Sequence, residues 1–316
     1  MIERPTPTLA IVGAGAVGST IAYAALMRGA ARRVVLHDVN AAKVRAEVLD
    51  IAHGIQFMPM GQIEGSDDVG ICAGADIVAV TAGAKQRPGQ TRMLLAEATV
   101  GLMRTIMPRL AEVAPDATYV MVTNPVDVVT YAALAICGLP PTRLFGSGTV
   151  LDSSRLRWLV ATEVGVSVHN VHAYVAGEHG DSEIPLWSSA SVGGVPLLEW
   201  ERHTGLLGQA ARERIAAEVV GSAYQIIEGK GATNYAVALA VSRIVESVLR
   251  DERRVLPVST LLSGWQGIDE VCMSVPTVLH RGGAGERLAV PLSDGERVAL
   301  ARSADRIRAV ARGLGF

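Results

Sequence analysis

A single histidine stands among glycines and acids in the segment Gly177–Ser182, which reads Gly-Glu-His-Gly-Asp-Ser. The glycines make a helix interior unfavourable, so we expect a loop in which a substrate can approach the imidazole of His179 closely. Neighbouring carboxylates can select one tautomer of the ring and bring its pKa into the range where it both gives and accepts a proton. The segment therefore indicates a proton-transfer residue. The alternative is a surface loop whose acids are simply solvated.

A second candidate group lies in residues 146–157, which read Gly-Ser-Gly-Thr-Val-Leu-Asp-Ser-Ser-Arg-Leu-Arg and open a helix. Asp152 and Arg155 are three positions apart and share one face of that helix, whereas Arg157 points well away from them. A guanidinium can hold a carboxylate through two parallel hydrogen bonds, which an ammonium does less well. The pair can therefore serve one site, although an ordinary surface salt bridge has the same spacing.

Two further candidates follow predicted strands. Residues 81–92 contain Gly, Pro and three basic side chains, which is typical of a loop that can move over a site. Arg92 opens the next helix, where a cation is unfavourable for the helix dipole, so we expect it to polarise a substrate carbonyl. Asn124 precedes Pro125 and is held extended, where its amide could bind a ligand. A solvated charged loop and a helix-initiating Asn-Pro turn are the alternatives.

These residues need a scaffold, and the start of the chain predicts one. Gly-Ala-Gly-Ala-Val-Gly occupies residues 13–18, after an apolar strand at Thr8–Val12 and before a helix that runs through Met27. A second strand, Arg33–His37, ends at Asp38. This is the G-x-G-x-x-G motif in the strand–turn–helix context that dinucleotide binding requires, with an acid about twenty residues further on.

Each residue of the motif has a physical task. Gly13 makes the turn, Gly15 lets the backbone approach a pyrophosphate, and Gly18 allows the helix and the strand to pack. The phosphates would lie at the helix N-terminus, where free N–H groups and the helix dipole favour anions. Asp38 would bind the ribose hydroxyls and repel a 2′-phosphate, so NAD is favoured over NADP.

Strands continue to alternate with helices through the first half, whereas the second half lacks this alternation. We therefore predict an α/β fold, a Rossmann doubly wound parallel sheet followed by an α+β substrate domain. The expected domains are 1–148 for NAD binding and 149–316 for substrate binding and catalysis. The expected first-half elements after Asp38 are helices Ala41–Gln56, Thr91–Val113 and Val126–Cys137 and strands Asp76–Val80 and Thr118–Val122. The expected second-half elements are helices Leu206–Glu228, Tyr235–Leu249 and Asp294–Leu314 and strands Val171–Val175, Val255–Ser259 and Val271–Val278.

Composition limits the class of protein. The chain has 316 residues, 49% hydrophobic and 19% charged, which fits a compact globular protein. The net charge of −2 does not suggest a nucleic-acid-binding protein, which would need a clustered basic surface. Cys72, Cys137 and Cys272 show no metal-binding spacing and suggest a reducing compartment, so we expect the cytoplasm and no metal site. The uncharged stretch Leu9–Met27 is interrupted by glycines, and we expect a strand, a turn and a helix rather than a membrane span.

Together these parts describe one reaction. NAD carries the hydride, His179 handles the proton, and Asp152 stabilises the imidazolium. Arg155 holds a carboxylate, and Arg92 polarises the C–O bond where charge develops. The sequence therefore predicts oxidation of a 2-hydroxy acid or reduction of a 2-oxo acid.

At this point the chain resembles the L-lactate/malate dehydrogenase family, most closely its bacterial L-lactate members, over almost its whole length. The motifs that carry the resemblance are Gly-Ala-Gly-Ala-Val-Gly with Asp38, the loop to Arg92, Thr-Asn-Pro-Val-Asp at 123–127, Gly-Thr-Val-Leu-Asp-Ser-Ser-Arg at 148–155, Gly-Glu-His-Gly-Asp-Ser at 177–182, and Lys-Gly-Ala-Thr at 230–233. The resemblance implies NAD as cofactor and reversible hydride transfer between lactate and pyruvate.

The resemblance also implies a role for each matching residue. His179 is the acid/base with Asp152 as its partner, Arg155 binds the substrate carboxylate, and Arg92 is the arginine of the mobile loop. Asn124 and Thr233 belong to the substrate site. The residues implied to bind the cofactor are Gly13, Gly15, Ala16, Val17, Gly18, Asp38, Thr81, Gly83 and Asn124.

Substrate choice depends on Gln86, which stands where lactate enzymes of the family carry glutamine and malate enzymes carry arginine. A neutral amide tolerates the methyl group of pyruvate, whereas the second carboxylate of oxaloacetate needs a cation. Lys85 and Arg87 flank it, and a slip of one residue would bring a cation inward. Malate dehydrogenase and a broader 2-hydroxy acid dehydrogenase are therefore the alternatives, and a non-catalytic NAD-binding sensor is a third.

Regulation is a further expectation from the resemblance. Arg157 and His172 match positions that bind fructose 1,6-bisphosphate at a subunit interface in allosteric bacterial lactate enzymes, so a homotetramer with this effector is expected. Ordinary surface or interface residues are the alternative. Asn234 departs from the family, which more often carries an aromatic residue beside Thr233.

Overall fold

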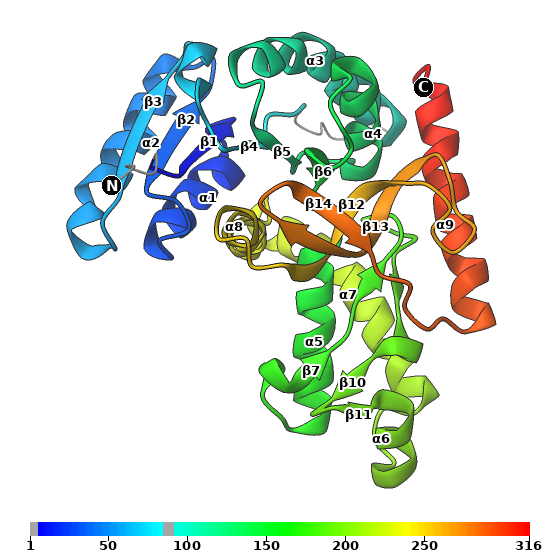
Figure 1. Ribbon diagram of the computed structural model, residues 1–316. Helices are drawn as coiled ribbons and strands as arrows, with labels where there is room; N and C mark the ends of the chain where they lie inside the picture. Colours follow the sequence, from blue (N-terminus) through cyan, green and yellow to red (C-terminus); the bar gives the residue numbers. More distant parts are fainter. Residues whose placement is uncertain (1–5, 85–91) are drawn as a thin grey trace.

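The computed structural model describes residues 6–84 and 92–316, and a nine-stranded sheet lies at the centre of this part of the chain (Figure 1). Six of its strands come from the first half, pair in parallel and have the order β3-β2-β1-β4-β5-β6. They are β1 (Thr8–Val12), β2 (Arg33–His37), β3 (Gln62–Ser66), β4 (Ile77–Val80), β5 (Thr118–Met121) and β6 (Leu144–Gly146). The strand order reverses between β1 and β4, and ligands of such sheets bind at this switch point.

Helices cover both faces of the sheet, and the alternation of side chains along each strand explains why. In β1, Leu9 and Ile11 pack against α1 on one face, while Ala10 and Val12 pack against α3 and α4 on the other. The helices of the first half are α1 (Ala16–Met27), α2 (Ala41–His53), α3 (Arg92–Val113) and α4 (Val126–Cys137), with short 3₁₀ turns at Ile55–Phe57 and Val69–Cys72. The predicted doubly wound parallel fold is confirmed.

The second half extends the same sheet instead of starting a separate one. β12 (Arg254–Leu262) pairs antiparallel with β6, and β13 (Val271–His280) and β14 (Gly283–Arg287) follow in antiparallel order. Helix α8 (Tyr235–Leu249) packs on α1, so the second half also covers part of the dinucleotide-binding half. The division after residue 148 stays a prediction, because one sheet contains strands from both sides of it.

The remaining elements build the lower lobe and the right edge of the molecule in Figure 1. A buried cluster that includes Leu156, Val160 and Ile215 joins α5 and α7. The elements are helices α5 (Val150–Val164), α6 (Leu197–Thr204), α7 (Gln209–Lys230) and α9 (Asp294–Gly313), strands β7 (Val171–His172), β8 (Val175–Ala176), β9 (Ile184–Pro185), β10 (Ser191–Val192) and β11 (Val195–Pro196), and 3₁₀ turns Val168–Asn170 and Trp187–Ser189. The predicted α+β architecture of the second half is therefore observed.

Several predicted boundaries are wrong. The helix expected over Ala41–Gln56 ends at His53, because Gly54 caps it and a 3₁₀ turn follows. The single strand expected over Val171–Val175 is two short strands in different sheets, β7 beside β10 and β8 beside β9. The helix expected from Leu206 begins three residues later, after Gly208. Strands β3 and β6 are absent from the prediction, because β3 has a single buried residue, Ile63, and β6 has only three residues.

Other differences amount to one or two residues, which is the usual uncertainty of an element's end. The strands expected over Asp76–Val80 and Thr118–Val122 are Ile77–Val80 and Thr118–Met121. The last helix ends at Gly313 instead of Leu314. The strands expected over Val255–Ser259 and Val271–Val278 are longer, as Arg254–Leu262 and Val271–His280.

Within the described residues, no helix is both long and apolar enough to cross a membrane.

Candidate active site

The loop that carries His179 is held at its start by two other elements. Gly177 forms an antiparallel bridge with Ser274 of β13, in which each backbone N–H donates to the other residue's carbonyl, with N to O distances of 2.9 and 3.0 Å. The next backbone N–H, that of Glu178, donates to the hydroxyl of Ser303 on α9 at 2.8 Å. Gly177 has a φ of +97° and lies against Ser303, so a side chain would be strained there.

Asp127, at the start of α4, anchors the same loop at the histidine itself. The backbone N–H of His179 donates to Asp127 Oδ2 at 2.7 Å, and the Ser259 hydroxyl donates to Asp127 Oδ1 at 2.6 Å. Asp127 is buried, and burial raises its pKa to about 6 against the opposing effect of these hydrogen bonds. The sequence analysis missed Asp127, although an acid directly after Asn124-Pro125-Val126 was the available signal.

His179 and Asp152 form the predicted pair. Asp152 lies in the first turn of α5, is 1% exposed, and its Oδ2 lies 2.7 Å from His179 Nδ1. Its other oxygen, Oδ1, accepts a hydrogen bond of 2.5 Å from Arg155 Nη1, as the three-residue spacing predicted. Burial opposes ionisation of Asp152, but the charges of His179 and Arg155 outweigh it and lower its pKa. Asp152 is therefore a carboxylate that orients the imidazole through Nδ1.

This arrangement raises the pKa of the His179 imidazole. Burial disfavours the imidazolium, but the charge and hydrogen bond of Asp152 outweigh it, with further contributions from Glu183 and Asp127. The pKa of His179 rises to about 9 as a result. At neutral pH the ring is protonated, and with Nδ1 turned to Asp152 its Nε2 is the nitrogen left to meet a substrate.

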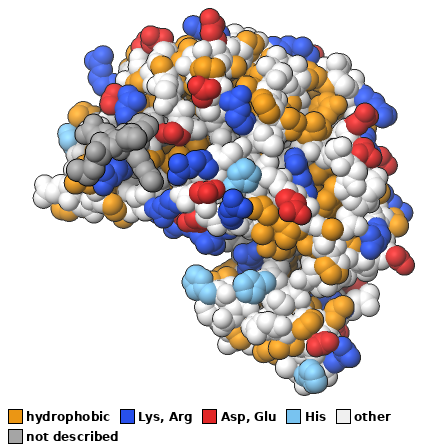
Figure 2. Space-filling model, in the orientation of Figure 1, with side chains coloured by type: hydrophobic (Ala, Val, Ile, Leu, Met, Phe, Trp, Pro, Cys, Tyr) orange, Lys and Arg blue, Asp and Glu red, His pale blue; other side chains and the backbone are white. Residues whose placement is uncertain are grey.

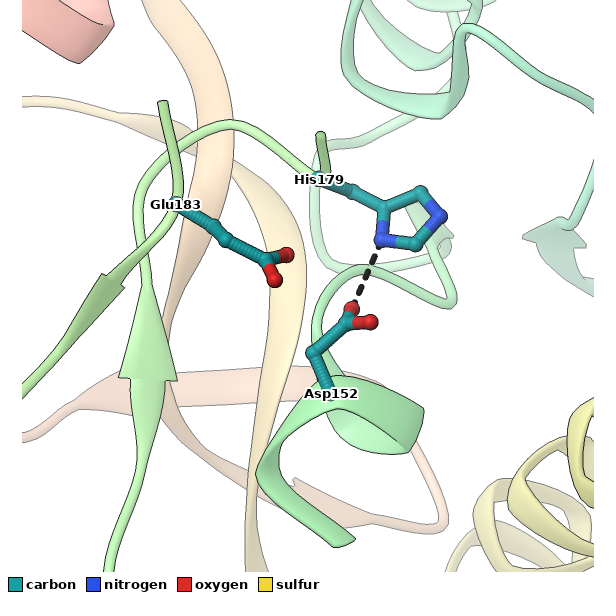
Figure 3. Close-up of side chains that lie close together, drawn as sticks. All are labelled: Asp152, His179 and Glu183. Atoms are coloured by element: carbon teal, nitrogen blue, oxygen red, sulfur yellow. Dashed lines mark hydrogen bonds and ion pairs between the residues drawn. The ribbon is translucent and has the colours of Figure 1, made fainter. Parts of the chain in front are cut away.

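Glu183 is a third titratable group beside this pair, and the sequence analysis missed it. Figure 3 shows its carboxyl directed toward Asp152 and His179. One ligand-type atom from each of the three residues lies within 4.8 Å of the others, as a metal site would require. Arg155 and His179 already occupy the two oxygens of Asp152, so the cluster fits proton chemistry better than a cation.

A cavity of about 320 Å³ brings the predicted site residues together. Its walls come from α1, the segments after β4 and β5, α3, the start of α5, the His179 loop, α7 and α8. The residues of the sequence prediction that line it are Val17, Thr81, Gly83, Asn124, Arg155, His179 and Thr233. Figure 2 shows charged side chains of both signs gathered across the middle of one face of the molecule.

The glycine motif forms a cradle at one side of the same cavity. A Cβ on Gly18 would overlap the carbonyl oxygen of Gly13, which leaves only glycine room where α1 meets the strand. Nothing lies within 4 Å of the position that a Cβ on Gly15 would take, so the backbone at the start of α1 is open to a ligand. Gly15 is also the N-cap of α1 and offers no side chain to its free N–H groups.

Asp38 and Thr81 hold this cradle in place. Asp38 Oδ2 accepts the backbone N–H of Ala14 at 2.8 Å, and the Thr81 hydroxyl donates to the carbonyl of Gly13 at 3.0 Å. The exposed Ala16 follows Gly15 as the first residue of α1. Free N–H groups, an open backbone and a carboxylate at the end of β2 fit the pyrophosphate and ribose of a dinucleotide.

Some predicted residues lie elsewhere. Gln86, like Lys85 and Arg87, is outside the described residues, as is the side chain of Arg92, whose backbone begins α3. Arg157 points away from the cavity, as predicted. Its Nε donates to the carbonyl of Ala173 at 2.8 Å, and its guanidinium lies 5.1 Å from the centre of the Tyr174 ring. His172 is exposed on β7.

A glycine cradle that suits a dinucleotide, with a histidine oriented by a buried carboxylate and an arginine beside it, is typical of a dehydrogenase that uses a nicotinamide cofactor. The comparisons with known proteins name the family. Residues 8–146 match the lactate/malate dehydrogenase NAD binding domain, and residues 149–312 match the lactate/malate dehydrogenase alpha/beta C-terminal domain. The chain belongs to the lactate/malate dehydrogenase family and is an NAD-dependent oxidoreductase.

Individual relatives are similar over nearly their full length. The chain is 55% identical to an L-lactate dehydrogenase of Bifidobacterium animalis subsp. lactis, covering 100% of both chains. It is 44% identical to that of Gloeobacter violaceus, covering 97% of this chain and 93% of the relative. Its sequence is 34% identical to that of the minor L-lactate dehydrogenase from Enterococcus mundtii, whose crystal structure is in the ligands-bound form. That structure superimposes with a TM-score of 0.95 and covers 98% of this chain and 99% of its own.

Proposed function

We propose that this protein is an L-lactate dehydrogenase that interconverts lactate and pyruvate with NAD. The observation that carries the proposal is the placement of Arg155 and His179 in the cavity beside the glycine cradle. Relatives named L-lactate dehydrogenase, at 55% and 44% identity, support the choice of substrate.

His179 acts as the acid in pyruvate reduction and as the base in lactate oxidation. When bound, NADH supplies the hydride to the carbonyl carbon, and NAD⁺ accepts it in the reverse direction. As the carbonyl oxygen of pyruvate gains electrons, the imidazolium gives it a proton and becomes neutral imidazole. Asp152 Oδ2 lies 2.7 Å from His179 Nδ1 and accepts its N–H, so Nε2 faces the substrate in both directions of the reaction.

Arg155 binds the substrate carboxylate in this proposal. One of its five N–H groups donates to Asp152 at 2.5 Å, which anchors the guanidinium and leaves an edge for a second carboxylate. Asn124 and Thr233 also line the cavity and are proposed to contact the substrate.

The residues proposed for the cofactor are those of the cradle and its supports, with Asp38 toward the ribose. Arg92 is proposed to polarise the reacting carbonyl from the start of α3. Gln86 is proposed to select the methyl group of pyruvate over a second carboxylate, as its neutral amide favours.

The first test is NADH oxidation with pyruvate or with oxaloacetate. A preference for pyruvate would support the proposal, and replacement of Gln86 by Arg should then move the preference toward oxaloacetate. A preference of the unmodified protein for oxaloacetate would mean that Lys85 or Arg87 faces the substrate and that the activity is malate dehydrogenase. If the protein binds NADH but oxidises it with no 2-oxo acid, the alternative of a non-catalytic NAD-binding sensor is favoured.

A homotetramer activated by fructose 1,6-bisphosphate and located in the cytoplasm completes the proposal. Arg157 and His172 carry the effector part, since an arginine and a histidine suit a phosphate. Exposed large apolar side chains such as Trp158, which is 60% exposed, support subunit contacts. Free thiols at all three cysteines support a reducing compartment. The same assay with and without fructose 1,6-bisphosphate tests the effector, and sedimentation velocity tests the tetramer.

A further inference from the structure

The Asp152–His179 pair has a buried neighbour that the mechanism above does not use. Glu183 is 8% exposed and sits at the end of a tight turn, where its backbone N–H donates to the carbonyl of Gly180 at 3.2 Å. This turn directs the side chain inward, and Figure 3 shows its carboxyl beside the pair without a dashed contact to either residue. A buried carboxyl in this position must influence the charge of its neighbours.

We propose that Glu183 is a positioning residue that acts through His179, and that its carboxyl sets the upper pH limit at which His179 keeps its proton. The inference rests on the proposed function for its catalytic consequence, but its effect on the imidazole needs no substrate.

The charges that face Glu183 explain how it works. Burial is the largest effect and raises the pKa of Glu183, and the negative charge of Asp152 raises it further. The positive charges of His179 and Arg155 oppose this rise, and the pKa of Glu183 is about 8. Near neutrality Glu183 is therefore uncharged, and the cluster consists of one anion, Asp152, with two cations. A bound substrate carboxylate then balances that excess positive charge.

Above the pKa of Glu183 its carboxyl is ionised, and Coulomb's law gives the sign of its effect on His179. A second negative charge within a few ångströms of the imidazolium stabilises it, so His179 keeps its proton to higher pH than it could beside Asp152 alone. Asp127, which accepts from the backbone of His179, acts in the same direction but is the smaller contributor.

The test is an NMR titration of His179 in protein with ring-labelled histidine and no cofactor or substrate. The His179 resonance is the one missing from H179Q. Glu183→Gln keeps the shape of the protonated carboxyl and cannot ionise. The midpoint of the His179 titration should fall by about one pH unit in E183Q, as expected for a lost charge at this distance.

Glu178→Gln is the matched control. Glu178 lies on the same loop and accepts a 2.5 Å hydrogen bond from Ser182, which a glutamine oxygen can also accept. E178Q should leave the His179 midpoint in place. A midpoint unchanged in E183Q, or lowered equally in both variants, would overturn the proposal.

Activity gives a second readout. In E183Q the fall of kcat/KM for pyruvate on the alkaline side should begin about one pH unit lower than in the unmodified protein. Absence of any turnover would contradict the proposed function and would leave the imidazole titration to decide this inference.

Should E183Q fail to fold, infrared difference spectra between pH 7 and pH 9 replace it. A protonated carboxyl band that disappears over this range in the unmodified protein, and shifts in E183D, would support the proposal. No such band would overturn it.

Discussion

The two halves of this active site are built in different ways. The cofactor side uses backbone: an open glycine at Gly15, a helix N-terminus and a tight packing contact at Gly18. The proton-transfer side uses buried side chains, in which Asp152 and Asp127 from two helices hold one histidine from a loop. The first arrangement is local in sequence, whereas the second needs segments that are far apart in the chain.

Because the two sides are built differently, we expect substitutions on each side to impair the enzyme in different ways. Loss of a buried side chain on the proton-transfer side removes a chemical step and leaves the scaffold in place. Loss of a glycine on the cofactor side alters the backbone that defines the binding surface. Four experiments separate the two kinds of loss.

Replacement of His179 by Gln should lower turnover with pyruvate by about 10³-fold or more, because the proton donor is gone. NADH binding, followed by fluorescence, should stay close to that of the unmodified protein, since the cradle lies on the other side of the cavity. Equal turnover in H179Q would sink the acid/base assignment.

Replacement of Arg155 by Lys should raise KM for pyruvate by about 10²-fold, because an ammonium cannot hold the substrate carboxylate and Asp152 through a planar fork. Steady-state kinetics at fixed saturating NADH measure this. A KM that does not move would show that another cation binds the carboxylate.

Two glycine variants separate folding from cofactor binding. Gly18→Ala places a Cβ onto the carbonyl oxygen of Gly13 and should lower thermal stability together with NADH affinity. Gly15→Ala meets nothing within 4 Å and should keep its thermal stability while NADH affinity falls by about tenfold. Thermal melts and fluorescence titrations measure both. A G15A protein with normal NADH affinity would contradict the cradle.

The pH dependence is the mildest test. Since the folded-state pKa of His179 is raised to about 9, pyruvate reduction should stay level through neutral pH. It should then fall about tenfold per pH unit above that value. Lactate oxidation needs the neutral imidazole, so it should rise about tenfold per pH unit up to that value and then stay level. A reduction rate that falls already near pH 6.5 would mean that Asp152 does not raise the pKa of His179.

Much of the fold was predictable because its signals are short-range. The apolar strands, the glycine turn and the acid at Asp38 occupy about thirty consecutive residues, and all of them adopt the expected elements. The Asp152–Arg155 contact follows from helix spacing alone. Short strands such as β6 escaped, since three residues carry no periodic pattern and the sheet recruits them through its neighbours.

The sequence by itself determined the class of cofactor, and it also pointed to the proposed proton-transfer residue and the proposed carboxylate-binding arginine, because each depends on residue types at fixed local spacing. Only the tertiary structure decided which other acids join them. Asp127 reaches the backbone of His179 across 52 positions of sequence, and Glu183 turns inward beside Asp152, which comes from another segment. Burial depends on contacts between distant segments, and burial controls whether a carboxyl is an ordinary solvated charge or part of the active site.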